Sequence, residues 1–157
     1  MKTCVVFYSH SGNVRFYGER IAEKLAVPAF SLEPVSPLKG TGFGSIFKGG
    51  GQAVTGQKPA LKELPDLSGF DRVVLGLPVW AGRCAAPAYT FLSSGALKEK
   101  SVCLFTLSGS GKDEKALAMV RAAAGGVSAH TALVDRAVKA SAGNEEKLAV
   151  FLKEIEG

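Results

Sequence analysis

The segment TCVVFYSHSGNV, residues 3–14, joins an apolar run to a loop of small, hydroxylated residues. The run at 3–8 is rich in β-branched and aromatic residues, which predicts a strand, and the amphipathic residues 15–26 predict a helix. A loop that leads from a strand into a helix presents the unpaired N–H groups of the first helical turn and the positive end of the helix dipole. The segment therefore predicts a cradle for a phosphate-bearing ligand.

The rest of the chain repeats this alternation of strand and helix. Further strands are predicted at residues 29–32, 72–77, 102–107 and 131–135, and further helices at 87–92, 114–124 and 145–155, the last capped by Asn144. Parallel strands need crossover connections, which are normally helical, so we expect an α/β three-layer sandwich. In a five-stranded parallel sheet of order 2-1-3-4-5, the loops after the first and third strands flank the point where ligands bind.

Residues 33–69 are rich in glycine and proline and carry no clear strand. They hold one amphipathic stretch, residues 43–54, in which Phe43, Ile46 and Phe47 are expected to face inward. The segment is interpreted as a long crossover with one short helix. The alternative is a lid beside the ligand, because long loops are often functional.

Length and composition indicate one domain, residues 1–157, with a substantial core, since 46% of the residues are hydrophobic. No apolar run approaches the roughly 20 residues of a membrane helix, and the first residues lack the pattern of a secretory signal. We therefore expect a cytoplasmic protein without membrane insertion. The sequence leaves the oligomeric state open.

The net charge of +5 is spread evenly over the two halves of the chain, and no aromatic-rich basic surface accompanies it, which disfavours nucleic-acid binding. The three cysteines form no CxxC pair, so neither a disulfide framework nor a metal site is indicated. Cys4 and Cys103 belong to apolar strands and are expected in the core. Cys84 lies in a loop, where packing at a helix start is favoured over a redox-active thiol.

Two nucleotide-binding patterns are incomplete in this chain. The stretch SGSGK at 108–112 resembles a Walker loop, but Thr106 stands where the pattern needs glycine and Asp113 where it needs a hydroxyl. An ATPase is therefore disfavoured. The stretch GTGFGS at 40–45 lacks the third glycine of a dinucleotide fingerprint and a preceding strong strand, so it is interpreted as a flexible turn.

Three loops of small residues should instead open on one edge of the sheet: residues 9–14, 76–83 and 108–111. Trp80 follows a proline and stands between small residues, which suits a flat side chain that stacks on a flat ligand. The alternative is that Trp80 plugs the loop over the core.

These three segments resemble the flavodoxin-like family of FMN-binding α/β proteins, and the resemblance covers nearly the whole chain. Residues 9–13 are similar to the hydroxyl-x-hydroxyl-glycine phosphate loop of that family. Residues 71–82 are similar to its segment of aspartate, apolar strand, glycine, x, proline, apolar residue and tryptophan, and residues 104–109 to its flavin-edge loop. The resemblance implies the flavodoxin-like fold and FMN as the cofactor.

The resemblance also implies a role for each loop. The FMN phosphate would be held by Ser9, Ser11, Gly12 and Asn13, the isoalloxazine ring lined by Pro78, Val79, Trp80, Ala81 and Gly82, and its pyrimidine side approached by Ser108, Gly109, Ser110 and Gly111. Val14 stands where the family usually has another hydroxyl, so charge would come from His10 or Arg15. An exposed loop residue is an equally good interpretation of His10. Arg83 and Lys112 are candidate cations near a reduced flavin.

The function implied is electron transfer by a flavodoxin-like protein, with redox proteins as partners. The third loop has no aromatic residue, unless Tyr89 or Phe43 reaches across the ring, and the sequence is basic. Both features favour the alternative of an NAD(P)H-dependent FMN or quinone reductase. Val14 motivates a further alternative, an interaction module that has lost its flavin.

Overall fold

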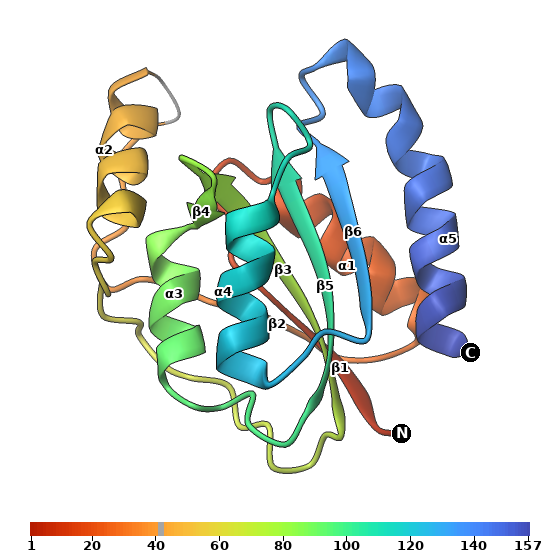
Figure 1. The fold of residues 1–157 in the computed structure, drawn as a ribbon. Coiled ribbons are helices and arrows are strands. Elements are labelled where there is room, and N and C mark those ends of the chain that lie inside the picture. Colours follow the sequence, from red (N-terminus) through yellow and green to blue (C-terminus); the bar gives the residue numbers. More distant parts are fainter. Residues whose placement is uncertain (41–42) are drawn as a thin grey trace.

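A parallel β-sheet forms the centre of the computed structural model, which describes residues 1–40 and 43–157, with the side chains of 43–48 excepted. Five strands run parallel in the order β2-β1-β3-β5-β6 (Figure 1). Their bounds are Ala29–Ser31 for β2, Thr3–Phe7 for β1, Arg72–Trp80 for β3, Ser101–Ser108 for β5 and Ala129–Val134 for β6. This is the predicted 2-1-3-4-5 order, which is therefore confirmed.

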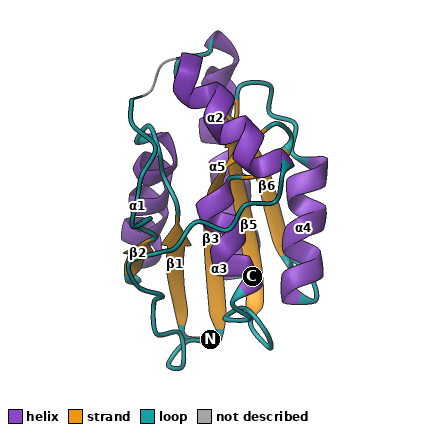
Figure 2. Cartoon of the chain, turned by 90° about the vertical axis from the view of Figure 1, so that its left-hand side faces the viewer, coloured by secondary structure: helices purple, strands orange, loops and turns teal. Residues whose placement is uncertain are grey.

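Helices cover both faces of the sheet, as Figures 1 and 2 show. On one face lie α1, Asn13–Leu25, and α5, Asn144–Glu156, which a short 3-10 helix, Lys139–Gly143, precedes. On the other face lie α2, Phe43–Val54, α3, Ala86–Ser93, and α4, Glu114–Ala124. The helix predicted at 43–54 in the long crossover is thus confirmed. Phe43, Ile46 and Phe47 were expected to face inward, and their side chains are not among those described. Thr41 and Gly42, part of the expected turn at 40–45, lie outside the described residues.

The sheet separates two hydrophobic clusters because successive residues of a strand point to opposite faces. Val5 and Phe7 pack with α1 and α5, whereas Cys4 and Val6 pack with α3 and α4. The continuous apolar runs of β1 and β3 are therefore buried on both sides, as expected for central strands.

Gly76 of β3 provides the space for an aromatic ring in the neighbouring strand. It is the register partner of Phe105, and a Cβ atom at position 76 would lie 2.1 Å from the Cζ atom of that ring. The glycine of the third strand is therefore a packing requirement of the core.

The end of the third strand differs from the prediction. The apolar run predicted a strand that ends at residue 77, and the next residue, Pro78, has no amide hydrogen for a sheet ladder. In the structure β3 continues through Pro78, which pairs with Leu107, and returns as the antiparallel strand β4, Arg83–Cys84. The part of the predicted loop at 76–83 that follows the predicted strand is therefore a tight hairpin.

Asn144 does not cap α5 as predicted. Its side-chain Oδ1 accepts a hydrogen bond from the Val134 N–H at 2.9 Å, and its Nδ2 donates to Val134 O at 2.7 Å. It also donates to the Tyr17 hydroxyl at 3.0 Å. The amide is thus used to attach the start of α5 to the end of β6 and to α1.

All three cysteines are buried and free. Burial raises the pKa of Cys84 to about 12, and its Sγ lies 3.5 Å from the Ala116 carbonyl oxygen. This thiol is therefore protonated and packs between the hairpin and α4. This agrees with the interpretation of Cys84 as a packing residue at a helix start rather than a redox-active thiol. No helix in the described part of the chain is long and apolar enough to cross a membrane.

Candidate functional site

The first loop turns from β1 into α1 through a left-handed glycine. Gly12 precedes the helix with φ of 93°, a conformation that glycine adopts without strain. A Cβ atom there would meet nothing within 4 Å, so the backbone angle rather than crowding requires glycine. The loop is further shaped by the Gly12 N–H, which donates to Ser9 Oγ at 3.1 Å.

The start of α1 presents a group of unused donors. The N–H groups of Ser11, Asn13, Val14 and Arg15 have no acceptor within the described chain, whereas the Phe16 N–H already bonds to Gly12 O. Such donors, with the positive end of the helix dipole, favour an anion. The backbone donors that the predicted cradle requires are therefore available at this helix start.

Asp135, which directly follows β6, brings a carboxylate to this cradle. Its Oδ1 accepts hydrogen bonds from Asn13 Nδ2 at 3.1 Å and from the Ala137 N–H at 2.9 Å. Sequence reasoning placed Asp135 at the end of a strand but not in the site. The carboxylate fixes Asn13 and adds negative charge beside the helix start.

The side chains of Arg15 and His10, which were expected to add charge to the cradle, contact other parts of the chain. The Arg15 guanidinium pairs with Glu19 at 3.3 Å and lies 3.5 Å from Glu33, so the charge expected from it is directed away from the cradle. His10 Nε2 lies 2.8 Å from Gly40 O. Val14 is 2% exposed and packs in the cluster below α1 and α5, which explains an apolar residue at this position.

The hairpin between β3 and β4 carries Trp80. Its turn residues Ala81 and Gly82 have φ of 50° and 79°, the pattern of a type I′ hairpin. Glycine adopts these positive φ angles without strain, whereas alanine does not. The half-buried indole of Trp80 meets the ring of Tyr8 edge to face, with centroids 5.8 Å apart. Burial raises the pKa of Tyr8 to about 12, so this neighbour is neutral.

Helix α2 lies against Trp80. A Cβ atom at Gly49 would be 3.0 Å from an indole carbon, so the backbone of α2 approaches the ring closely. Trp80 therefore packs against α2 and also lines a cavity at the strand ends, rather than standing in an open loop.

Two cavities follow the strand ends from the cradle to the hairpin. The first, of about 230 Å³, is lined by His10, Ser11, Asn13, Val14, Pro78, Val79, Trp80, Leu107, Ser108, Gly109 and Asp135. The second, of about 340 Å³, is lined by Val79, Ala81, Gly82, Ser108, Gly109, Ser110, Lys112, Glu114 and Lys115. They share Val79, Ser108 and Gly109, so we treat them as one trough.

The trough includes most of the residues predicted for the site. Ser9 lines a neighbouring cavity of about 200 Å³, and Gly12 and Gly111 line neither part of the trough. Gly111 instead shapes the third loop with φ of 73°, its N–H donating to Ser108 Oγ at 2.8 Å. Beyond Asp135, sequence reasoning missed Leu107, Glu114 and Lys115, of which Leu107 lies next to the carboxyl end of β5 and could have been found by the same strand-end rule.

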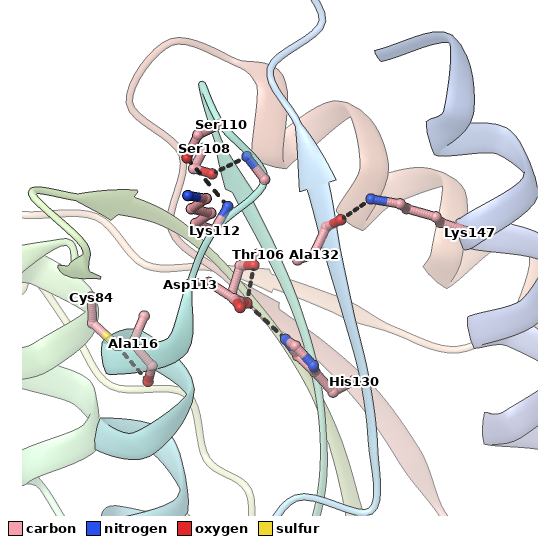
Figure 3. Close-up of polar contacts among 11 residues, drawn as sticks. Cys84, Thr106, Ser108, Ser110, Lys112, Asp113, Ala116, His130, Ala132 and Lys147 are labelled. Atoms are coloured by element: carbon pink, nitrogen blue, oxygen red, sulfur yellow. Dashed lines mark hydrogen bonds and ion pairs between the residues drawn. The ribbon is translucent and has the colours of Figure 1, made fainter. Parts of the chain in front are cut away.

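A buried carboxylate supports the third loop from behind (Figure 3). Asp113 Oδ2 accepts hydrogen bonds from Thr106 Oγ1 at 2.5 Å and lies 2.7 Å from His130 Nε2. Burial alone would raise the pKa of Asp113, but the contacts with His130 and Thr106 outweigh it and hold the pKa below its usual range. The loop at 108–112 is therefore anchored at its end to β5 and β6.

Two residues expected near the flavin lie elsewhere. Arg83 and Tyr89 line a separate cavity between α2, α3 and α4, which shares no lining residue with the trough. Tyr89 thus does not supply a second aromatic wall, and Phe43 lies outside the described side chains. The described residues contain no cluster of side chains able to hold a metal ion.

The fold matches several solved structures. A candidate flavoprotein from Bacteroides eggerthii aligns with a TM-score of 0.74 at 17% identity, over 96% of this chain and 97% of that one. The chain has a flavodoxin-like fold. A flavoprotein from Lactobacillus acidophilus in complex with FMN aligns at 0.69 with 19% identity, over 93% and 97%. Flavodoxin 2 from Bacillus cereus aligns at 0.57 with 15% identity, over 98% and 97%.

The comparisons based on sequence gave no match. No family model matches the chain, and no curated protein matches it either. The flavodoxin-like fold fixes where the trough lies, at the carboxyl ends of the strands where the strand order reverses.

Proposed function

We propose that this flavodoxin-like protein binds FMN in the trough and transfers electrons. The observation that carries the proposal is the continuity of the trough, which leads from the free N–H groups of α1 past Trp80 to the exposed hairpin turn. A phosphate group fits the first end and a planar ring the second. The proposal is supported by the fold shared with an FMN-bound flavoprotein from Lactobacillus acidophilus.

The residues of the trough have separate tasks in this proposal. The N–H groups of Ser11, Asn13 and Val14 hold the phosphate, and Ser9 keeps the turn closed through its bond to Gly12. Val79 and Trp80 line the ring, and the loop at 108–111 approaches its edge. Bound FMN supplies the capacity to accept and release electrons, while the protein fixes its position and surroundings.

The charge of the trough favours a low reduction potential. Pro78, Val79 and Leu107 are apolar, and Asp135 adds a carboxylate at the phosphate end. Apolar surroundings and a nearby negative charge both disfavour added negative charge on a bound group. The lysines that line the trough, Lys112 and Lys115, lie in its second part and partly offset this effect.

The same two lysines favour a second candidate function, that of an NAD(P)H-dependent FMN or quinone reductase. Ala81 and Gly82 at the turn are exposed, so the second part of the trough is accessible to a small reductant. Lys112 and Lys115 would attract the phosphates of a nicotinamide cofactor there. In the carrier role, the same exposed turn would contact a redox protein.

An anaerobic titration distinguishes these functions. Full-length protein loaded with FMN is mixed first with NADH or NADPH and then with dithionite, while its visible spectrum is recorded. An electron carrier keeps its flavin absorption with both nicotinamides and loses it with dithionite; rapid bleaching by a nicotinamide indicates the reductase. If the protein releases all of its FMN on gel filtration, and the Trp80→Ala variant behaves in the same way, the result would instead support an interaction module without flavin.

A further inference from the structure

A groove of about 400 Å³ is lined by residues of α2, α3 and α4. These helices lie on the face of the sheet opposite α1 and α5 (Figures 1 and 2). The walls of the groove are mainly apolar and come from Ala53, Leu92, Met119 and Ala123. Its size falls within the roughly 300–1,000 Å³ that is typical of small-molecule sites. Since the groove and the trough share no lining residue, a ligand in the groove would be additional to FMN.

Arg83 gives the groove an uncompensated positive charge. Its side chain is half-buried, and within the described chain its guanidinium has neither a hydrogen-bond acceptor nor a carboxylate partner. Among the described residues, none that lines the groove is acidic. A cation removed partly from water without a partner is costly, and an anion that reaches it recovers this cost.

An aromatic wall lies beside this charge. Tyr89 from α3 lines the groove, and Met119 from α4 lines it as well, a side chain that packs well against aromatic rings. Lys58 Nζ stands 5.2 Å from the Tyr89 ring centroid and adds a second positive charge next to this wall. The groove thus combines an apolar, aromatic surface with two cations.

We propose that the groove binds a small aromatic carboxylate, with its ring against Tyr89, Leu92 and Met119 and its carboxylate on Arg83. The guanidinium offers paired donors that match the two oxygens of a carboxylate. A neutral aromatic molecule would fill the apolar part and leave Arg83 without a partner. The charge on the ligand is therefore the decisive feature.

The hairpin connects this groove to the trough. Arg83 is the direct cross-strand partner of Trp80, across a turn in which Ala81 has φ of 50°. Side chains of directly paired residues lie on the same face of a hairpin, and here both face α2, through Gly49 and Ala53. A carboxylate on Arg83 would therefore be sensed at Trp80.

The test compares two probes that differ in charge alone, 2-naphthoate and its neutral amide, 2-naphthamide. Each is titrated into full-length, isotope-labelled protein, with and without FMN, while backbone amide and Trp80 indole resonances are followed by NMR. We expect saturable naphthoate shifts at Arg83, Tyr89 and Met119 and at the indole, with at least tenfold weaker binding of naphthamide. Equal affinities, shifts centred elsewhere or no saturation would overturn the proposal. Because the groove is separate from the trough, the result is independent of whether FMN binds.

Four variants sharpen the test. Arg83→Gln should weaken naphthoate binding at least tenfold and leave naphthamide binding unchanged, while Arg83→Lys should retain most of the difference between the probes. Lys153→Gln, an exposed charge on α5, is the matched control and should have no effect. Ala122→Phe, at an exposed position of the groove wall, should block both probes. If Lys153→Gln weakened naphthoate as much as Arg83→Gln, the attraction would be one of net charge and the site would be excluded.

Discussion

Asn13, the first residue of α1, donates a hydrogen bond from its side-chain amide to the carboxylate of Asp135 at 3.1 Å. The two residues follow β1 and β6, which are separated by two other strands in the sheet. The contact closes the phosphate end of the trough and places a negative charge there. In the proposed FMN site, this carboxylate would limit the affinity of the cradle for phosphate.

Asp135→Asn should increase the affinity for FMN several-fold. The asparagine oxygen can still accept from Asn13 and from the Ala137 N–H, so the loop is retained while the negative charge is removed. Removing a like charge about 4 Å from an anion is worth about 1 kcal/mol at the dielectric constant of water. Isothermal titration calorimetry with FMN and with riboflavin measures the effect. Riboflavin, which lacks the phosphate, is the control, and an equal gain for both ligands would contradict this account.

Two of the three successive glycines of α2, Gly49 and Gly51, should respond differently to alanine. At Gly51 a Cβ atom meets nothing within 4 Å, so Gly51→Ala should stabilise the helix by about 1 kcal/mol. At Gly49 the new methyl group would press on the Trp80 ring at 3.0 Å. We therefore expect slower amide hydrogen exchange in α2 for Gly51→Ala, and a changed Trp80 emission for Gly49→Ala alone. Identical emission spectra for the two variants would show that α2 does not rest on Trp80.

The Asp113 carboxyl should make stability depend on pH in the acid range. Because its pKa in the folded protein is lowered, it stabilises the fold above its unfolded pKa of about 4, and this contribution is lost as pH falls through the lower folded value. Asp113→Asn should cost about 1–3 kcal/mol at pH 7 and flatten the decline in acid. Urea unfolding between pH 3 and 7 tests this, and parallel curves for the two proteins would refute it.

Gly76→Ala should strongly destabilise the protein, by about 3 kcal/mol, because the methyl group would overlap the ring of Phe105. Gly69→Ala is the matched control, since a Cβ atom there has no neighbour within 4 Å, and it should change stability by no more than about 0.5 kcal/mol. Thermal unfolding of both variants provides the measurement. Similar melting temperatures for the two would mean that Phe105 has room to move aside.

The alternation of strands and helices and the helix start after Gly12 could be predicted because each rests on local signals, whereas the strand order follows from the resemblance to the flavodoxin-like family. The apolar runs of β1 and β3 define buried strands, and Gly12 before an amphipathic stretch marks a helix start. The hairpin at Ala81 and Gly82 was not predictable from Pro78, since a proline normally ends a strand and here the strand continues past it.

Long-range polar contacts were beyond the sequence. Asp135 joins the cradle across two intervening strands, and Asp113 gathers Thr106 and His130 from two different strands, so no spacing along the chain encodes either contact. The sequence also contains no signal for where the side chains of Arg15 and Arg83 point. Each lies close in sequence to the predicted site, yet the first pairs with Glu19 and Glu33 and the second lines the groove.

The most direct test of the central proposal is a fluorescence titration of FMN with the full-length protein, repeated with riboflavin and with the Trp80→Ala variant. We predict saturable quenching of FMN at one flavin per chain, weaker binding of riboflavin, which has no phosphate for the α1 cradle, and loss of binding in Trp80→Ala. Absence of quenching, or equal affinity for FMN and riboflavin, would contradict the account.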